Sequence, residues 1–120
     1  MEGDSVELKA HTPDTNKVQA DNIRINGKAW HLMKVNEECL ELAAAITKYF
    51  TKGGDEVEIM KEAGDVEIAL SNLRGIYGPK AIVIDIAKDA KIQRIAHKTE
   101  ELERNGGSYG DDMLERMQEK

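Results

Sequence analysis

Aromatic residues, prolines and cysteines are scarce in this sequence. Its 120 residues include one Trp, one Phe, three Tyr and two Pro. With so few aromatic side chains the interior must be aliphatic, and the abundant Glu, Lys and Ala favour helices over sheets. The lone Cys39 cannot form an internal disulfide, which is typical of a reducing cytoplasm. We expect Cys39 to be a small core residue.

Long apolar runs and an excess of positive charge are also absent. No segment approaches the roughly 20 apolar residues that span a bilayer, and no signal-like segment opens the chain, so we expect a cytoplasmic protein without membrane contact. The formal net charge of −6 makes a nucleic-acid polymer a poor partner. A chain of this length forms one domain, which an oligomer would help to stabilise.

The two ends of the chain differ from its middle. Residues 1–27 are polar and predict an N-terminal arm or a short hairpin, in which Ile23–Gly27 is a candidate strand. Residues 28–104 form the expected helical domain, and residues 105–120 are expected to be a tail or a short helix. The fold class is therefore predicted to be all-α, as a helical bundle.

Within the helical domain, apolar residues recur at spacings of three and four. This periodicity predicts one helix over 28–52, which Gly53 ends, and a second from Asp55 to Tyr77. Pro79 is well placed to begin a third helix. The segment 81–87 is β-branched and also suits a strand, but its helical continuation favours a buried helix.

The chemistry of the chain is concentrated in two pairs of acids. Glu38 and Glu41 lie one turn apart on the first predicted helix, and Glu62 and Asp65 lie one turn apart on the second. On a helical wheel Glu62 falls within the apolar face, where an unpaired carboxylate is costly. The pairs therefore predict a site for Mg²⁺ or Mn²⁺, which prefer hard oxygen ligands. The alternative is that three acids are solvated and Glu62 pairs with a lysine.

The same residues resemble a known family signature. Glu37-Glu38-x-x-Glu41-Leu42, followed by Glu62-x-x-Asp65-Val66, is similar to the motif of the all-α nucleoside triphosphate pyrophosphohydrolases, which include the MazG-like enzymes. The resemblance covers residues 28–102, where Lys91-x-x-Arg94 matches a basic pair of MazG-like members. It implies a four-helix bundle, as a homodimer or homotetramer.

The implied function is Mg²⁺-dependent cleavage of a (d)NTP into a (d)NMP and pyrophosphate. Glu38, Glu41, Glu62 and Asp65 would hold the metal, and Glu38 or Glu41 would orient and deprotonate the attacking water. Lys91 and Arg94 would bind the phosphates, or else form a solvated face. Asn72 is a candidate to contact the base, although a solvated Asn is the competing interpretation.

Alternative functions stay open at this point. A phosphoribosyl-ATP pyrophosphatase-like or dUTPase-like hydrolase would use the same four acids. A non-catalytic helical interaction or nucleotide-binding module is the alternative from another class.

Overall fold

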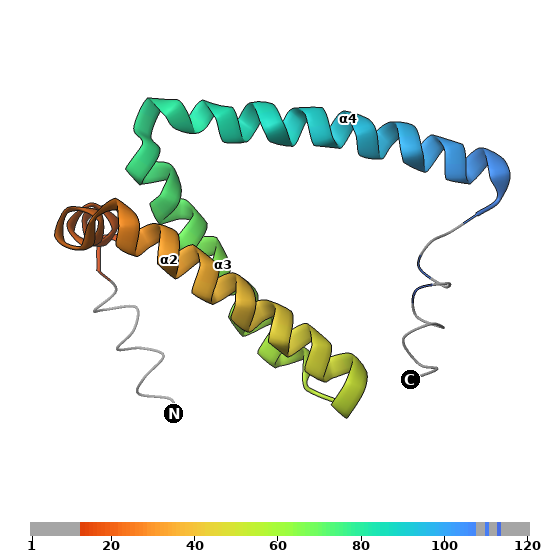
Figure 1. Cartoon of the computed structure of the whole chain (residues 1–120), viewed down its shortest axis with the longest axis horizontal. Helices are drawn as coiled ribbons and strands as arrows, with labels where there is room; N and C mark the ends of the chain where they lie inside the picture. Colours follow the sequence, from red (N-terminus) through yellow and green to blue (C-terminus); the bar gives the residue numbers. More distant parts are fainter. Residues whose placement is uncertain (1–12, 108–109, 111–112, 114–120) are drawn as a thin grey trace.

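A computed structural model describes residues 13–107, 110 and 113 (Figure 1). The elements, in chain order, are α2 (Thr15–Lys52), α3 (Glu56–Tyr77), the 3₁₀ turn η1 (Gly78–Ala81) and α4 (Ile82–Asn105). The all-α prediction is confirmed, and no strand occurs among the described residues. Most of the predicted C-terminal tail or short helix lies outside the described residues.

Helix α2 consists of two arms that meet at Gly27. This residue has φ 76° and ψ 176°, a conformation that only glycine adopts readily, so the helical path breaks there. The first arm covers residues 15–26 and is capped by Asp14, whose side chain accepts hydrogen bonds from the backbone of Asn16 and Lys17. The strand predicted over Ile23–Gly27 is therefore wrong: these residues belong to a helix and to the kink that ends it.

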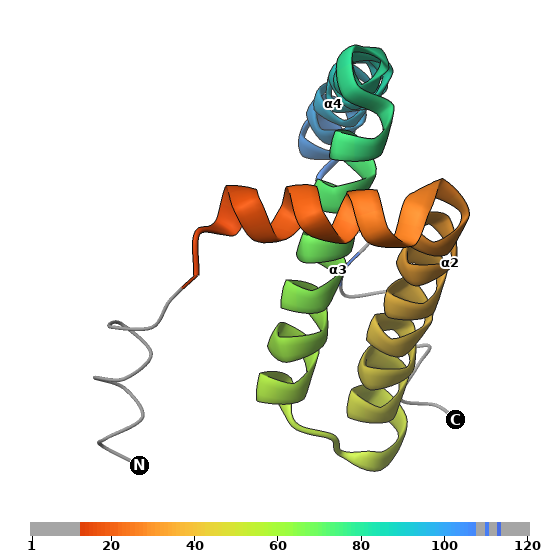
Figure 2. The same cartoon turned by 90° about the vertical axis from the view of Figure 1, so that its left-hand side faces the viewer.

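The first arm of α2 lies across α3 (Figure 2). Gln19 Nε2 donates to Ser71 Oγ at 2.7 Å, and Ile23 packs onto Gly75. A Cβ at Gly75 would lie 2.5 Å from Ile23 Cδ1, so any other residue at this position would have to displace that methyl group. These two contacts hold the first arm of α2 against α3.

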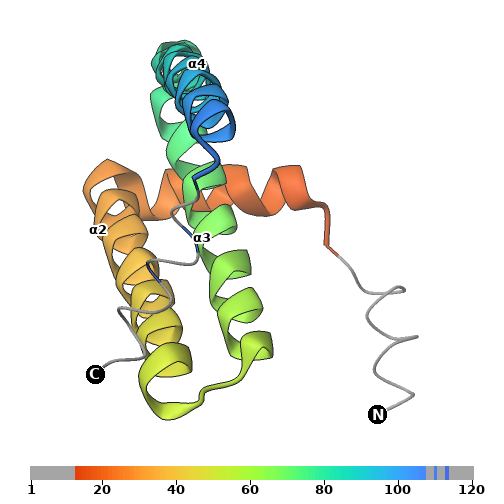
Figure 3. The ribbon, with the colours of Figure 1, turned by 90° about the vertical axis from the view of Figure 1, so that its right-hand side faces the viewer.

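The second arm of α2 and α3 form an antiparallel helical hairpin (Figure 3). Gly53 ends α2 in the left-handed conformation, and Asp55 caps α3 by accepting a hydrogen bond from Val57 N at 2.9 Å. The predicted helices over 28–52 and 55–77 are thus confirmed to within a residue or two at their ends.

Helix α4 leaves this hairpin after Pro79 and runs away from it (Figure 1). The segment 82–87 is helical, as preferred over a strand, but it is exposed apart from the half-buried Ile84. An ion pair of 2.9 Å between Arg74 and Asp85 ties the start of α4 to α3.

The core of the described chain is small. Ala69 is its one fully buried hydrophobic residue, and Cys39 is exposed, so the prediction that Cys39 is a core residue is wrong for the single chain. Apolar residues of α2 that share a face with Cys39 are also more than a third exposed, for example Leu32 and Phe50. Among the described residues, no helix is both long and apolar enough to cross a membrane.

Candidate metal centre

The four predicted acids converge where α2 and α3 lie side by side. Glu38 and Glu41 come from α2, and Glu62 and Asp65 come from α3. One carboxylate oxygen from each residue lies within 4.8 Å of the corresponding oxygens of the other three. The i, i+3 spacing places each pair on one helix face, and the antiparallel hairpin brings the two faces together.

Two of these carboxylates are poorly solvated. Glu38 is only 8% exposed, while Glu62 is half-buried, so the wheel was wrong in placing Glu62 deepest. The Oε2 atoms of both residues are buried and have no hydrogen-bond partner. A buried, unpartnered carboxylate oxygen is costly, and a cation in the cluster would remove that cost. Glu41 and Asp65 are exposed and close the cluster on its solvent side.

The electrostatics of the cluster follow from this crowding. Burial is the main cause that raises the pKa of Glu38, and the negative charges of Glu41 and Asp65 raise it further. Burial likewise raises the pKa of Glu62, with the same two acids as the next causes. Each carboxyl therefore holds a proton more tightly than usual in the absence of a cation, and a divalent ion would compete with that proton.

Lys34 is the basic side chain that reaches the cluster. Its Nζ lies 3.6 Å from Glu38 Oε1 and 3.5 Å from Glu37 Oε1. Glu37 has an exposed side chain outside the four-acid cluster, as the helical wheel predicted. Lys34 was not identified from the sequence, although its i, i+4 spacing to Glu38 is a signal that was available.

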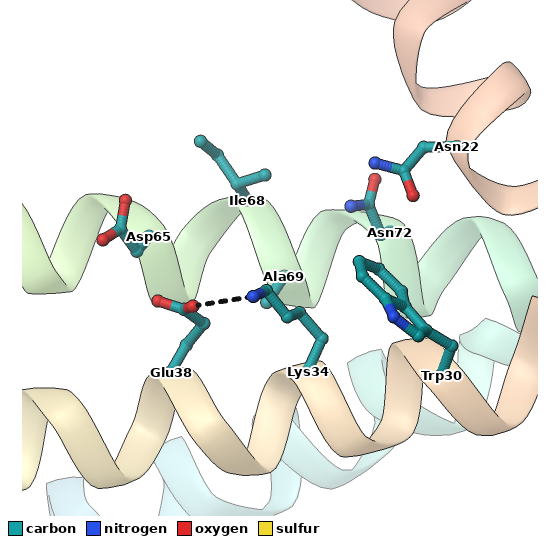
Figure 4. Close-up of a pocket in the computed structure, with 8 residues that line it drawn as sticks. All are labelled: Asn22, Trp30, Lys34, Glu38, Asp65, Ile68, Ala69 and Asn72. Atoms are coloured by element: carbon teal, nitrogen blue, oxygen red, sulfur yellow. Dashed lines mark ion pairs between the residues drawn. The ribbon is translucent and has the colours of Figure 1, made fainter. Parts of the chain in front are cut away.

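A cavity of about 250 Å³ opens beside the acids (Figure 4). Glu38 and Asp65 lie at one end of it, and Trp30, Asn22 and Asn72 lie at the other. Lys34, Ile68 and Ala69 line the remainder. The Lys34 ammonium also lies 5.6 Å from the centre of the Trp30 ring, so it interacts with that ring as well as with Glu37 and Glu38.

The amide end of the cavity has unused hydrogen-bonding capacity. Asn72 is 8% exposed and has no hydrogen-bond partner among the described residues, so the competing expectation of a solvated Asn is wrong. Asn22 Oδ1 accepts from Asn26 at 2.8 Å, which leaves the Asn22 NH₂ group without a partner in the same part of the chain. A planar polar ligand could therefore bond to both amides.

His31 connects the two arms of α2 through a hydrogen bond to Asn22, one of the cavity's lining residues. It is 1% exposed, and its Nε2 donates to the backbone oxygen of Asn22 at 3.1 Å across the Gly27 kink. Neither the role of His31 nor that of Asn22 was predicted from the sequence. The kink at Gly27 brings these two residues together, and hydrophobic periodicity does not predict such a kink.

Lys91 and Arg94, in contrast, are not brought to the acids within one chain. Both are exposed on α4, and that helix packs against neither α2 nor the body of α3 in the described structure. The cluster and the cavity thus come from the hairpin and the first arm of α2.

The donor set suits a hard divalent cation. Four carboxylates from two helices, two with orphaned buried oxygens, fit the oxygen coordination of Mg²⁺ or Mn²⁺. Comparison of the chain with protein-family models, curated proteins and solved structures finds no match. The resemblance to MazG-like enzymes consequently stays a prediction that depends on the residues themselves.

Proposed function

We propose that the protein is a Mg²⁺-dependent nucleoside triphosphate pyrophosphohydrolase that converts a (d)NTP into a (d)NMP and pyrophosphate. The observation that carries this proposal is a juxtaposition: a four-carboxylate cluster with orphaned buried oxygens adjoins a cavity lined by one aromatic ring and two amides. The cluster suits a metal–phosphate complex, and the cavity suits a nucleobase. The ligand that needs both at once is a nucleotide.

The acids divide into two roles. Glu38, Glu41, Glu62 and Asp65 would hold the cation, with Mn²⁺ as a substitute for Mg²⁺. When bound, the cation supplies positive charge that neutralises phosphate oxygens and favours attack by water. Glu38 or Glu41 would accept the proton of that water, and the raised pKa of Glu38 suits it to this role. The water oxygen joins the α-phosphorus as the bond from the α-phosphorus to the bridging oxygen breaks and pyrophosphate leaves.

The nucleoside would occupy the other end of the cavity. The Trp30 ring is 41% exposed and offers a stacking surface for a base. The Asn72 amide presents a donor and an acceptor side by side, and Asn22 adds a second donor, so both can bond to a base edge. Because Lys34 lies between Trp30 and Glu38, it would meet the phosphate nearest the sugar.

A non-catalytic interaction module is the second candidate, favoured by the exposed apolar residues of α4 such as Ile82 and Val83. Hydrolysis of a nucleotide distinguishes the enzyme from the non-catalytic interaction module. We therefore suggest incubating the protein with each NTP and dNTP, including dUTP, and with phosphoribosyl-ATP, in the presence of Mg²⁺. The enzyme should release pyrophosphate rather than phosphate, and EDTA should stop the reaction.

The variants Glu62→Gln and Glu37→Gln make this assay specific. Glu62 belongs to the cluster, whereas Glu37 is an acid of the same hairpin that lies outside it. Loss of pyrophosphate release in the first variant and its retention in the second would support the proposal. Because Trp30 is the only tryptophan, its fluorescence reports nucleotide binding independently of turnover. A protein that neither hydrolyses a nucleotide nor changes Trp30 emission on nucleotide addition would refute the proposed function.

A further inference from the structure

A second cavity lies between the first arm of α2 and α3, and we call it the arm cavity. It has a volume of about 230 Å³, close to the 250 Å³ of the cavity beside the acids, which we call the nucleotide cavity. Val18 and Ile68 contribute apolar surface to the arm cavity, and Thr15, Gln19 and Ser71 contribute hydroxyl and amide groups. None of its lining residues carries a charge.

The two cavities share a wall. Asn22, Ile68 and Asn72 line both of them, and the two amides lie at the end of the nucleotide cavity that is away from the acids (Figure 4). Asn72 is 8% exposed and has no hydrogen-bond partner among the described residues. Burying an unused amide is costly, so this side chain indicates a ligand that bonds to it.

The lack of charge decides which ligands the arm cavity excludes. The nucleotide cavity has Glu38 and Asp65 of the candidate metal centre, together with the Lys34 ammonium. The arm cavity offers a phosphate neither a cation nor a set of metal ligands. A phosphate group that loses its water without gaining a cation is strongly disfavoured. The ligand of the arm cavity is therefore uncharged.

The free polar groups indicate the chemistry of that ligand. Gln19 Nε2 donates to Ser71 Oγ at 2.7 Å, which leaves Gln19 Oε1 as an acceptor. The Thr15 hydroxyl also has no partner among the described residues. Such groups bond to the hydroxyls of a sugar, whereas the amides of the shared wall bond to the polar edge of a base. An uncharged molecule that combines a flat heterocycle with sugar hydroxyls is a nucleoside.

We propose that the arm cavity is a second site, which binds a nucleoside and thereby withdraws Asn22 and Asn72 from a nucleotide in the neighbouring cavity. Each amide has few bonding positions, so a base on one side of the wall leaves fewer for a base on the other side. Binding of the nucleoside and binding of the nucleotide therefore weaken each other by the same factor. The effect on hydrolysis rests on the proposed function, whereas nucleoside binding does not.

Calorimetric titration in EDTA tests the site without metal and without turnover. The wild type is titrated with each ribonucleoside and deoxynucleoside, and at least one of them should bind. Val18→Phe places a ring in the arm cavity and should lower the affinity for that nucleoside roughly tenfold or more. Thr15→Phe repeats the test at a second lining residue and should give a similar loss.

Two control variants locate the bound nucleoside. Ile25→Phe is a similar change on the first arm of α2, at a residue that is 68% exposed and lines neither cavity, so the affinity should be unchanged. Trp30→Leu removes the stacking surface of the nucleotide cavity alone and should also leave the affinity unchanged. Circular dichroism of each variant checks that its helix content equals that of the wild type.

Kinetics test the link between the two cavities. A saturating nucleoside should raise the KM of the wild type for a nucleotide roughly tenfold and leave kcat unchanged, because the amides bind the base and take no part in the chemical step. Val18 lies outside the candidate catalytic machinery, so Val18→Phe should keep the wild-type KM without nucleoside. Added nucleoside should no longer raise the KM of this variant.

The outcomes separate this proposal from the proposed function. A wild type that binds no nucleoside overturns the arm cavity as a site, as does unchanged affinity in Val18→Phe and Thr15→Phe. Loss of affinity in Trp30→Leu also overturns it, because the nucleoside then occupies the nucleotide cavity. If the wild type hydrolyses no nucleotide, the proposed function fails, and the titrations in EDTA still decide whether the arm cavity binds a nucleoside.

Discussion

Metal-dependent stability is the prediction that tests the candidate site most directly. Four carboxylates and the Lys34 ammonium leave a formal charge of −3 at the cluster, which Mg²⁺ reduces to −1. An ion that binds only the folded chain stabilises it by about 2.7 kcal/mol when its concentration is 100 times the Kd. For a chain of 120 residues this is a Tm increase of roughly 10 °C. The wild type should show that increase in scanning calorimetry between EDTA and saturating Mg²⁺ at fixed protein concentration.

Glu38→Gln and Glu37→Gln separate the cluster from ordinary surface charge. The first removes a carboxylate whose Oε2 is buried and unpartnered, so the metal-free protein should melt higher than the metal-free wild type. The Mg²⁺ affinity of this variant should fall tenfold or more. At the same Mg²⁺ concentration, a tenfold loss reduces the stabilisation by Mg²⁺ binding to about 1.4 kcal/mol and halves the Tm increase. Glu37→Gln should change neither quantity, because Glu37 lies outside the cluster. Equal melting points of the wild type in EDTA and Mg²⁺, or equal effects of the two substitutions, would refute the reasoning.

Three further predictions concern pH, the cavity and the contact between the first arm of α2 and α3. Because the pKa values of Glu38 and Glu62 are raised above 4.5, the folded metal-free protein binds more protons than the unfolded chain above that pH. Its free energy of unfolding should therefore fall as pH rises from about 4.5 to the folded-state pKa, and urea titrations in EDTA that show the opposite slope would contradict this. Asn72→Leu should raise KM for nucleotides roughly tenfold or more and leave the Mg²⁺-dependent Tm increase intact, as measured by kinetics and calorimetry. Gly75→Val should destabilise the fold by roughly 1–3 kcal/mol, since its Cβ would lie 2.5 Å from Ile23 Cδ1, and a shift in Trp30 emission should accompany the displaced first arm of α2.

The hairpin and its acids were predictable because their determinants are local. Gly53 and Asp55 mark the end of one helix and the start of the next, and the i, i+3 spacing places each acid pair on one face whatever surrounds it. A short connection between two helices of this length makes them antiparallel neighbours. These facts are sufficient to bring Glu38, Glu41, Glu62 and Asp65 together.

The depth of burial was not predictable from the same pattern. A helical wheel orders residues by angle alone, and it placed Glu62 deeper than Glu38 and Cys39 in the core, whereas the structure has Glu38 buried and Cys39 exposed. Burial depends on which neighbour covers a face, and the single chain leaves much of the predicted apolar face of α2 without one.

The sequence by itself determined the helices, their ends and the acid pairs, because each of these follows from interactions between residues a few positions apart. The tertiary structure alone decided that Gly27 turns the first arm of α2 across α3 and that His31 ties Asn22 beside Asn72 and Trp30. It also decided that Lys91 and Arg94 lie away from the acids of their own chain. The physical reason is that a backbone kink and a packing contact join residues far apart in the chain, and helical periodicity contains no information about such pairs.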